Sequence, residues 1–443
     1  SNTLRLNKTT FLKTSVGVST NYNQYLQDNF VNDADGNQIT KFRAVNATNR
    51  ENRVTLSSTL NKKFNAKWNM RAGILSERYL PDFSNEDRDD RISIPDENGD
   101  GVPDYFLTNT DLDDSYSVHQ AFLQAERKIT DEFSVTAGLH TQYHSYTEDQ
   151  VIEPRAAVSW QVRPNQRFSL AYGLHAQAIP SPILFYEEEV SPQQFARTND
   201  NLDFMKSHHF VLAYDRSLGD SWRLKAETYY QSLFDVPVEG FPSSYSILNE
   251  GSDFDFEEKG SLVNEGVGTN YGIELTLEKF FSKGYYMLMT TSIYESTYEG
   301  SDGIERNTAF NNSAVFNLLF GKEWKFGDGG KNAWTLDTKF TTAGGQRFTP
   351  IDLEGTRANA GREVRFDDIA FSEQYDPYLR WDVKFGVRIN GRKKNISHQF
   401  FVDFQNVTNR ENEFVRRYNE VTDEINLVEQ IGFFPDVMYR IQF

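Results

Sequence analysis

Hydrophobic and polar residues alternate along most of this chain, in runs of about 10–15 residues. The clearest run covers residues 379–389. Its apolar positions are Leu379, Trp381, Val383, Phe385, Val387 and Ile389, and its other positions are Arg380, Asp382, Lys384, Gly386 and Arg388. A period of two predicts a β-strand with one apolar and one polar face. In a soluble sandwich the polar face would meet bulk water, whereas in a membrane barrel it would line a wet lumen while the apolar face meets lipid. The alternation alone does not separate these two interpretations.

The same pattern recurs along the whole chain and predicts an all-β protein. It is especially regular at 133–140, 168–175 and 222–231. We count about 17 such strands, which is far more than a single sandwich uses. The number of strands therefore favours a larger closed or curved sheet.

The lengths of the expected connections favour a barrel. Short turns are expected near 61–65, 130–132, 163–166, 218–221, 282–284, 327–331 and 391–394. Long loops are expected near 81–114, 180–205, 236–266, 347–375 and 409–432. Apart from two links of middling length at 147–151 and 299–308, short and long connections take turns. Outer-membrane barrels show this rhythm because tight periplasmic turns lie at one end and long extracellular loops at the other.

The last strand gives independent support. Val437, Tyr439, Ile441 and Phe443 alternate with Met438, Arg440 and Gln442, and the chain stops on Phe443. A terminal aromatic residue in an alternating strand resembles the assembly signal read by the bacterial barrel-assembly machinery. The alternative is that a final strand merely ends in Phe.

Composition agrees with a membrane barrel and narrows the function. Aromatic residues make up 14% of the 443 residues, with 35 Phe and 22 Tyr, while the mean hydropathy is polar at −0.63. A barrel exposes lipid-facing residues at every second position only, so its apolar total stays ordinary. No apolar run of about 18 residues predicts a membrane helix. A net charge of −18 argues against nucleic acid as a partner. The absence of Cys decides little.

Several stretches resemble the TonB-dependent receptors of Bacteroidetes-type bacteria, which often carry a carboxypeptidase-regulatory-like domain before the plug. Over residues 150–443 their order and spacing are fairly specific, whereas residues 1–150 share only the strand rhythm. The stretches are Glu153–Arg155, Tyr172–Gln177, Asn264–Gly266 with Tyr271–Glu274, Gly344–Arg347 with Thr349–Asp352, Asp403–Asn409 and Phe434-Pro435.

This resemblance implies a transmembrane antiparallel β-barrel, with residues 1–443 forming the C-terminal portion of a 22-stranded barrel. It also implies an N-terminal plug that the TonB complex pulls, using the inner-membrane proton gradient. About 17 strands are present, and single-chain bacterial barrels use even numbers. We therefore expect the plug domain to be absent from this chain, together with about five strands. No signal peptide opens the chain, so we expect the start of the protein to lie upstream.

The sharpest local motif is a candidate calcium loop. Asp96, Asn98 and Asp100 place oxygen-bearing side chains at alternate positions, Gly101 permits a tight turn, and Asp104 is a further candidate ligand. The EF-hand position for a bidentate Glu is occupied by another residue type, so the motif is similar to shorter extracellular calcium loops. The alternative is a solvated acidic turn rich in Asp, Asn and Gly.

No catalytic constellation stands out, so we do not expect an enzyme. No Ser-His-Asp order, Walker loop or nucleotide glycine fingerprint occurs in a suitable setting. The seven His residues are scattered, and we expect them to pack in the lumen or the loops. His140 and His144 share a face but are separated by about 13 Å, from the strand rise per residue. His208 and His209 point to opposite faces.

Three functions remain open. The first is a TonB-dependent transporter in the bacterial outer membrane that imports an iron chelate such as a siderophore, a vitamin, an oligosaccharide or a peptide. The second is a passive porin or structural barrel. The third is a surface carbohydrate-binding adhesin, which would lack a lipid-facing aromatic belt. For import, Phe185, Tyr186, Phe254 and Phe256 could stack on a ligand, or could simply pack within their loops.

Under the import hypothesis the polar strand faces meet the plug and the substrate. The candidate substrate-binding residues are His175, Gln177, Arg223, Glu227, Arg380 and Asp382. The expected partners are the TonB complex through the plug, the barrel-assembly machinery, outer-membrane lipid and a surface lipoprotein. Calcium is the only cofactor that the sequence suggests.

Overall fold

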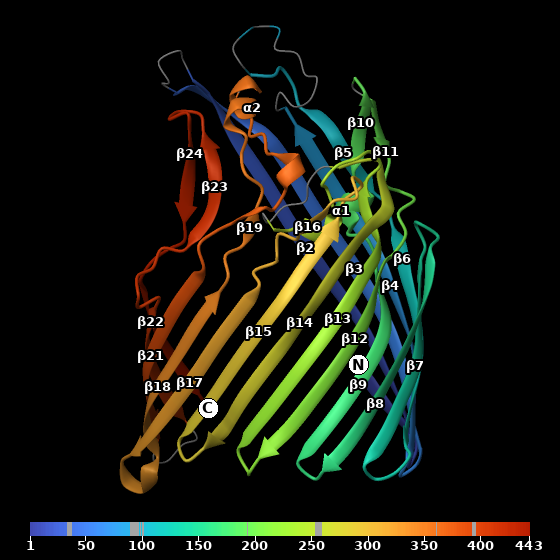
Figure 1. Ribbon diagram of the computed structural model, residues 1–443, viewed down its shortest axis with the longest axis vertical. Helices are drawn as coiled ribbons and strands as arrows, with labels where there is room; N and C mark the ends of the chain where they lie inside the picture. The colour runs from blue at the N-terminus through green and yellow to red at the C-terminus, as the bar shows by residue number, and fades with distance from the viewer. Residues whose placement is uncertain are drawn as a thin grey trace.

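A computed structural model describes residues 1–32, 38–88, 97, 99, 102–192, 194–252, 259–359, 361–391 and 396–443. It shows a tall, curved antiparallel sheet whose strands slant steeply across the molecule (Figure 1). The main sheet has 19 strands, of which two, β5 and β16, are short and pair only with the upper ends of β4 and β15. The remaining 17 strands agree with the number expected from the sequence.

The long strands follow one another around the sheet in chain order, each antiparallel to the next. They are β1 (Asn2–Asn7), β2 (Thr10–Asn32), β3 (Gln38–Asn65), β4 (Trp68–Asp87), β6 (Tyr116–Lys128), β7 (Phe133–His144), β8 (Gln150–Arg163), β9 (Gln166–Gln177), β12 (Met205–Leu218), β13 (Trp222–Glu239), β14 (Leu262–Ser282), β15 (Tyr285–Glu299), β17 (Ala314–Phe326), β18 (Asn332–Ala343), β21 (Tyr378–Asn390), β22 (Ser397–Gln405) and β25 (Phe434–Gln442).

The remaining elements belong to the connections and gather at one end. They are β5 (Leu107–Asp113), α1 (Ser181–Leu184), β10 (Glu187–Ser191), β11 (Gln194–Arg197), η1 (Ile247–Asn249), β16 (Glu305–Asn307), β19 (Arg347–Phe348), α2 (Leu353–Ala358), η3 (Asp367–Ile369), β20 (Glu373–Gln374), β23 (Glu413–Asn419) and β24 (Glu424–Glu429), with η2 (Asp328–Gly330) in a short turn at the other end. Within the described ranges, neither α-helix is long and apolar enough to cross a membrane.

Short turns and longer connections alternate as the sequence predicts, apart from the connection at 145–149, which is as short as some turns at the other end. The short turns lie together at the bottom of Figure 1, and α2, β10, β11, β23 and β24 lie at the top. One boundary differs from the expectation, because β3 continues through Asn65 and the turn occupies 66–67 instead of 61–65. Asn65 itself forms this turn, since its Oδ1 accepts a hydrogen bond of 2.8 Å from the backbone N–H of Lys67.

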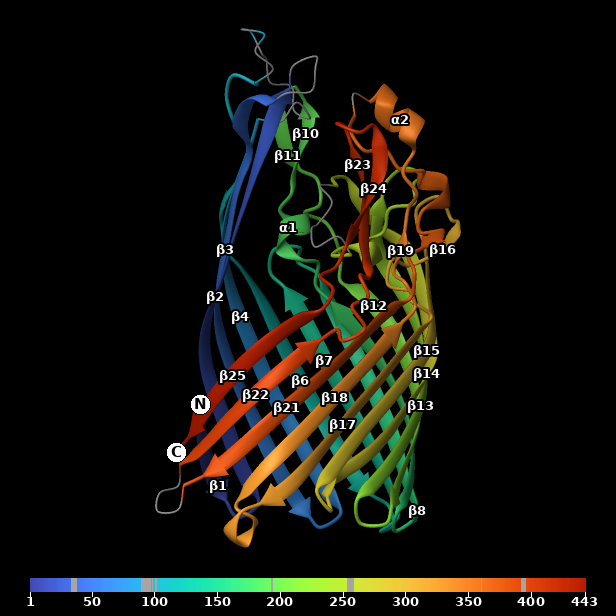
Figure 2. The same ribbon diagram turned by 90° about the vertical axis from the view of Figure 1, so that its left-hand side faces the viewer.

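Two of the long loops are shorter than expected, because strand pairing continues above the barrel wall. Strand β4 runs to Asp87 inside the expected 81–114 loop, and β13 and β14 extend to Glu239 and from Leu262 into the 236–266 loop. Strands β2 and β3 rise as one hairpin toward the top of the molecule (Figure 2). The hydrophobic–polar alternation therefore predicts which residues form the barrel strands. It does not predict where those strands end at the top, because their upper ends depend on pairing with neighbouring strands.

The outward face of the sheet is apolar. On β21, Trp381, Phe385 and Ile389 are 42%, 51% and 43% exposed, as expected for side chains that would contact lipid. Their neighbours Arg380, Asp382 and Lys384 point to the inside, where they are partly covered.

All six Trp side chains lie on this outward face. Five of them stand close to the short-turn end of their strands: Trp68, Trp160, Trp222, Trp324 and Trp334. Rings of aromatic residues at the lipid–water boundary are typical of membrane barrels. The short-turn end therefore carries one aromatic girdle, which the adhesin alternative does not explain.

The sheet has two edges. Among the described residues, β1 pairs only with β2 and β25 pairs only with β22. All six residues of β1 and all nine of β25 are exposed. Unpaired backbone groups at such edges are unfavourable in lipid, where no water can satisfy them.

Candidate functional site

The inward face of the sheet is a polar wall held by cross-strand hydrogen bonds and ion pairs. Tyr286 on β15 donates a hydrogen bond of 2.7 Å to Asp337 on β18. Arg388 on β21 lies 2.8 Å from a carboxylate oxygen of Glu323 on β17. A wet lumen lined by such groups can admit a polar ligand or a polar protein segment.

The six candidate substrate-binding residues all face this lumen, but they do not form one site. They lie on three strands: His175 and Gln177 on β9, Arg223 and Glu227 on β13, and Arg380 and Asp382 on β21. Strand β12 separates the first pair from the second, and β14, β15, β17 and β18 separate the second from the third. The structure therefore distributes them around the wall.

The pair on β13 belongs to a charged ladder. The Nε of Arg223 donates to Asp215 on β12 at 3.0 Å, and Lys225 lies 2.5 Å from Glu227 on its own strand. Directly opposite Glu227 stands Glu274 on β14, which is a like-charge pair. This part of the wall carries excess negative charge on its β14 side.

The pair on β21 is engaged in local structure. Arg380 Nε donates to Asp382 at 2.8 Å, and a second guanidinium nitrogen donates to Gln405 at 2.7 Å. Asp382 also accepts the backbone N–H of Asn406 at 2.8 Å. These contacts fix the start of the loop that follows β22.

A hydrophobic cluster fills the lumen side of the wall at the long-loop end. Ile183, Leu184 and Phe185, from α1 and its C-terminal end, are 1–2% exposed and pack against rings from the strands. The Phe185 ring centroid lies 5.6 Å from that of Tyr116 and 4.6 Å from that of Tyr146. The side chain of Phe185 thus packs within the protein and does not offer a surface for stacking on a ligand. Phe254 and Phe256 lie outside the described residues.

Buried polar contacts tie three of the long loops together. The guanidinium of Arg306 is 5% exposed, forms two hydrogen bonds with Asp302 at 2.9 and 2.7 Å, and donates to the backbone oxygen of Asp368 at 3.2 Å. Asp367 accepts hydrogen bonds from the backbone and hydroxyl of Ser244. Hydrogen bonding to Arg306 holds the pKa of Asp302 below its usual range. The loops at 240–261, 300–313 and 344–377 therefore form one unit.

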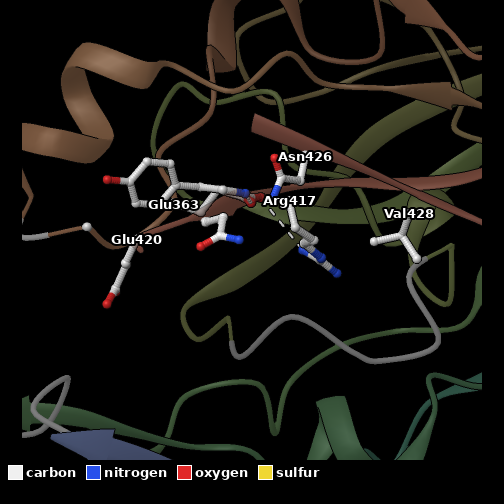
Figure 3. A pocket seen from close by; sticks show the side chains of 8 residues that line it. Glu363, Arg417, Glu420, Asn426 and Val428 are labelled. Carbon is white, nitrogen blue, oxygen red and sulfur yellow. Dashed lines mark hydrogen bonds and ion pairs between the residues drawn. The ribbon is translucent and has the colours of Figure 1, made fainter. Parts of the chain in front are cut away.

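A polar pocket of about 460 Å³ lies between the 344–377 loop and the β23–β24 hairpin. Figure 3 shows Glu363, Arg417 and Asn426 grouped at its centre, with Glu420 and Val428 at either side. Arg417 is 3.6 Å from Glu363, whose other oxygen accepts the backbone N–H of Tyr418 at 3.2 Å.

The rim of this pocket is braced by a second ion pair. Arg357 on α2 donates to Asp423 at 2.8 Å, and the Tyr418 hydroxyl donates to the same carboxylate at 2.9 Å. The pKa of Asp423 is lowered mainly by the hydrogen bond from Arg357. The pocket is open and polar, so it suits a hydrophilic group.

Most of the predicted calcium loop lies outside the described residues, namely Asp96, Asn98 and Asp100. Asp104 is described, and its Oδ2 accepts the backbone N–H of Glu97 at 2.9 Å. Elsewhere in the described parts of the chain, no three His, Cys, Asp or Glu side chains are arranged to hold a metal ion. Calcium binding therefore stays a prediction.

A slanted antiparallel sheet with an apolar aromatic exterior, a polar interior, short turns at one end and long loops at the other defines an outer-membrane β-barrel. Residues 1–407 match the family described as TonB dependent receptor-like, beta-barrel. The chain belongs to this family, which consists of transporters, and it is an outer-membrane protein. Outer-membrane barrels turn their short turns to the periplasm and their long loops outward, and we expect the same orientation of this chain.

Solved structures of such receptors have the same fold at low sequence identity. The ferric yersiniabactin uptake receptor FyuA from Yersinia pestis is 11% identical, with a TM-score of 0.64, and the match covers 99% of this chain and 59% of that one. BauA, the ferric preacinetobactin receptor from Acinetobacter baumannii, is 12% identical with a TM-score of 0.62, covering 99% and 61%. The outer membrane transporter YddB from Escherichia coli is 12% identical with a TM-score of 0.62, and the match covers 99% of this chain and 62% of that one. The chain thus spans about 60% of the length of these receptors. A search of curated proteins found no match.

The sequence did not reveal which lumen residues are neighbours. His209 was expected to pack in the lumen or the loops, and its ring does pack in the lumen, but the sequence did not show that its partner is His175, whose ring centroid lies 4.5 Å away. The nearest sequence signal was Gly173 two residues before His175, since a glycine on a wall face leaves room for a neighbouring ring. His208, as expected, points the other way and bonds to Tyr172 on the outward face.

Proposed function

We propose that this chain is the C-terminal barrel portion of an active outer-membrane transporter that imports a scarce nutrient. The observation that carries the proposal is the match of residues 1–407 to the TonB-dependent receptor barrel family. The polar lumen and the interlocked outer loops support it, because an importer needs a wet path and a rigid capture surface. In this function the chain performs no chemical reaction on its cargo.

We further propose that a plug and additional strands complete the barrel. The unpaired edges of β1 and β25 support this, since a spanning sheet must close to satisfy its backbone groups. The odd number of long strands, 17, also supports the proposal of additional strands, because single-chain bacterial barrels have even numbers of strands. The plug would carry the contact with the TonB complex. The barrel-assembly machinery would read the outward residues Val437, Tyr439, Ile441 and Phe443.

Metal chelates are the cargo class with the most support. Two of the compared structures are titled as receptors for ferric yersiniabactin and ferric preacinetobactin, and a third is titled a copper transporter. These titles describe those proteins. At 11–12% identity, the similarity shows only that this chain shares their fold. Vitamins, oligosaccharides and peptides therefore remain further candidates.

Energy dependence tests the proposal against a passive porin. Intact cells that express the full-length protein are supplied with a panel of ⁵⁵Fe-labelled chelates, with and without a protonophore. Active import predicts accumulation of at least one chelate that disappears in the gene deletion, in a strain without TonB and with the protonophore. Uptake that depends on the gene but continues with the protonophore would identify a passive pore instead. A deletion strain with unchanged uptake of every chelate would exclude this cargo class, and the panel is then repeated with labelled vitamins and oligosaccharides.

A further inference from the structure

Three neighbouring strands place a row of cationic and hydrogen-bond-donating groups on the lumen face. Arg155 on β8 stands opposite Gly173 on β9, and Gly173 stands opposite His209 on β12. His175 follows Gly173 on the same face of β9. We call Arg155, His175 and His209 the lumen row.

Gly173 makes the close approach of the two imidazoles possible. A Cβ at this position would lie 2.7 Å from Nε2 of His175, so the His175 ring lies over the glycine. This brings the ring centroids of His175 and His209 to 4.5 Å, at an interplanar angle of 45°. Both imidazoles are thereby directed to the same place on the wall as Arg155.

Among the described residues, the groups of the lumen row have no hydrogen-bond or ion-pair partner. The Nε of Arg155 is buried and without a hydrogen bond, and no carboxylate in the described ranges forms an ion pair with its guanidinium. Within the same ranges neither His175 nor His209 makes a hydrogen bond. Of these groups only the Nε of Arg155 is buried, while His175 is exposed and His209 is half-buried. A buried donor without a partner is unfavourable, so the guanidinium of Arg155 calls for a ligand, to which the two imidazoles could add hydrogen bonds.

One neighbouring carboxylate, Glu153, already has hydrogen-bond partners. Glu153 is 2% exposed and accepts hydrogen bonds from the backbone of Ala176 at 2.6 Å, from Gln142 at 3.3 Å and from His140. Gln120 caps the other nitrogen of His140 at 3.2 Å. This saturated group leaves the guanidinium of Arg155 and the two imidazoles facing the lumen.

We propose that the lumen row is an anion site that binds a carboxylate or phosphate group. A guanidinium binds either group through two parallel N–H bonds, and imidazole nitrogens add further donors. The proposal rests on the proposed transport function and narrows its substrate class to ligands with an anionic group. The same chemistry has a second source, because an acidic side chain of the plug could occupy the row between transport events.

The packing alternative is that the imidazoles merely cover Gly173 and that the stem of Arg155 fills space. The two interpretations differ in electrostatics. An anion site loses its ligand when the charge of Arg155 is removed and keeps it when Lys replaces Arg, although more weakly. A packing role depends on shape and is insensitive to salt.

The test uses the purified full-length receptor and the variants Arg155→Gln, Arg155→Lys and His175→Gln/His209→Gln. Arg163→Gln is the control for the loss of one positive charge, because Arg163 ends the same strand, far from the lumen row. Equilibrium dialysis with ³²P-labelled inorganic phosphate at low ionic strength measures the free site. We expect saturable binding to the parent and to Arg163→Gln, weakened about tenfold or more in Arg155→Gln and partly restored in Arg155→Lys.

A thermal unfolding arm distinguishes the plug as the source of the anion. If the row is filled internally, the parent binds no phosphate, and Arg155→Gln lowers the Tm by an amount that shrinks between about 0.05 and 0.5 M salt. Absence of phosphate binding combined with a salt-independent Tm, equal to that of Arg163→Gln, would overturn the anion site. Equal loss of phosphate binding in Arg155→Gln and Arg163→Gln would overturn it too. Neither measurement depends on uptake, so failure of the transport proposal remains separately visible.

Discussion

Replacing Phe385 by Arg tests whether the alternation on β21 separates lipid from lumen. The Phe385 side chain is 51% exposed on the outward face. It lies five residues before the end of β21 at Asn390. A rise of about 3.4 Å per residue and a tilt of about 40° place it roughly 13 Å above the periplasmic end, close to the centre of an apolar band about 25 Å tall.

At that depth an arginine has no partner, and we expect the free energy of unfolding to fall by about 2–4 kcal/mol. Ile389 faces the same way, one residue from the strand end, so Ile389→Arg should cost only about 0–1 kcal/mol. Lys384 faces the lumen and lies 5.6 Å from the ring of Phe401. Lys384→Gln should therefore also cost little, about 0.5–1 kcal/mol from the lost cation–π contact.

The assay is reversible urea unfolding of the full-length receptor in lipid vesicles, followed by tryptophan fluorescence, since all the Trp side chains lie on the outward face. The order of destabilisation should be Phe385→Arg first, with Ile389→Arg and Lys384→Gln well behind. Equal losses for Phe385→Arg and Lys384→Gln would refute the assignment of the two faces. Equal losses for Phe385→Arg and Ile389→Arg would refute the membrane depth.

Three further predictions concern the loops. The chain has no Cys, so Val421→Cys, 76% exposed on the β23–β24 hairpin, should react with an impermeant thiol reagent on intact cells, whereas Asp220→Cys in a periplasmic turn should react only after permeabilisation; the reverse pattern would invert the topology. Because Arg306 lowers the pKa of Asp302 below 3.8, the stability that this pair contributes is present above that pH and is lost as the pH falls below it. Protease cleavage of the 300–313 loop should then rise at low pH in the parent, and Asp302→Asn should be cleaved readily at neutral pH too; parent and variant with the same pH profile would contradict this. Calcium should bind residues 96–104 with a Kd of about 10⁻⁴–10⁻³ M and protect the 88–106 loop from proteolysis in the parent but not in Asp100→Ala, and equal cleavage with calcium and with chelator would reduce the motif to a solvated turn.

The sequence alone determined which way the side chains of each strand point. Successive side chains of a β-strand point to opposite faces. A local alternation such as that at 379–389 therefore shows which side chains share a face without any tertiary information. The connections of an antiparallel sheet lie at its two ends in turn, so the alternation of short and long connections predicted that the long loops gather at one end. These local signals were sufficient for the barrel class, and the family motifs were sufficient for the receptor family.

Only the tertiary structure decided where each strand ends and which residues meet across strands. The turn at 66–67 and the extension of β4 to Asp87 depend on pairing with partner strands, which no local pattern encodes. The lumen row depends on register: Arg155, Gly173 and His209 become neighbours because two turns fix how three strands align. A shift of one residue in either register would turn one of these side chains to the lipid face. In the sequence, Phe185 was a candidate either for stacking on a ligand or for packing within its loop. The structure buries its ring against Tyr116 and Tyr146. Burial depends on which residues pack around a side chain in space, and a loop sequence does not show this.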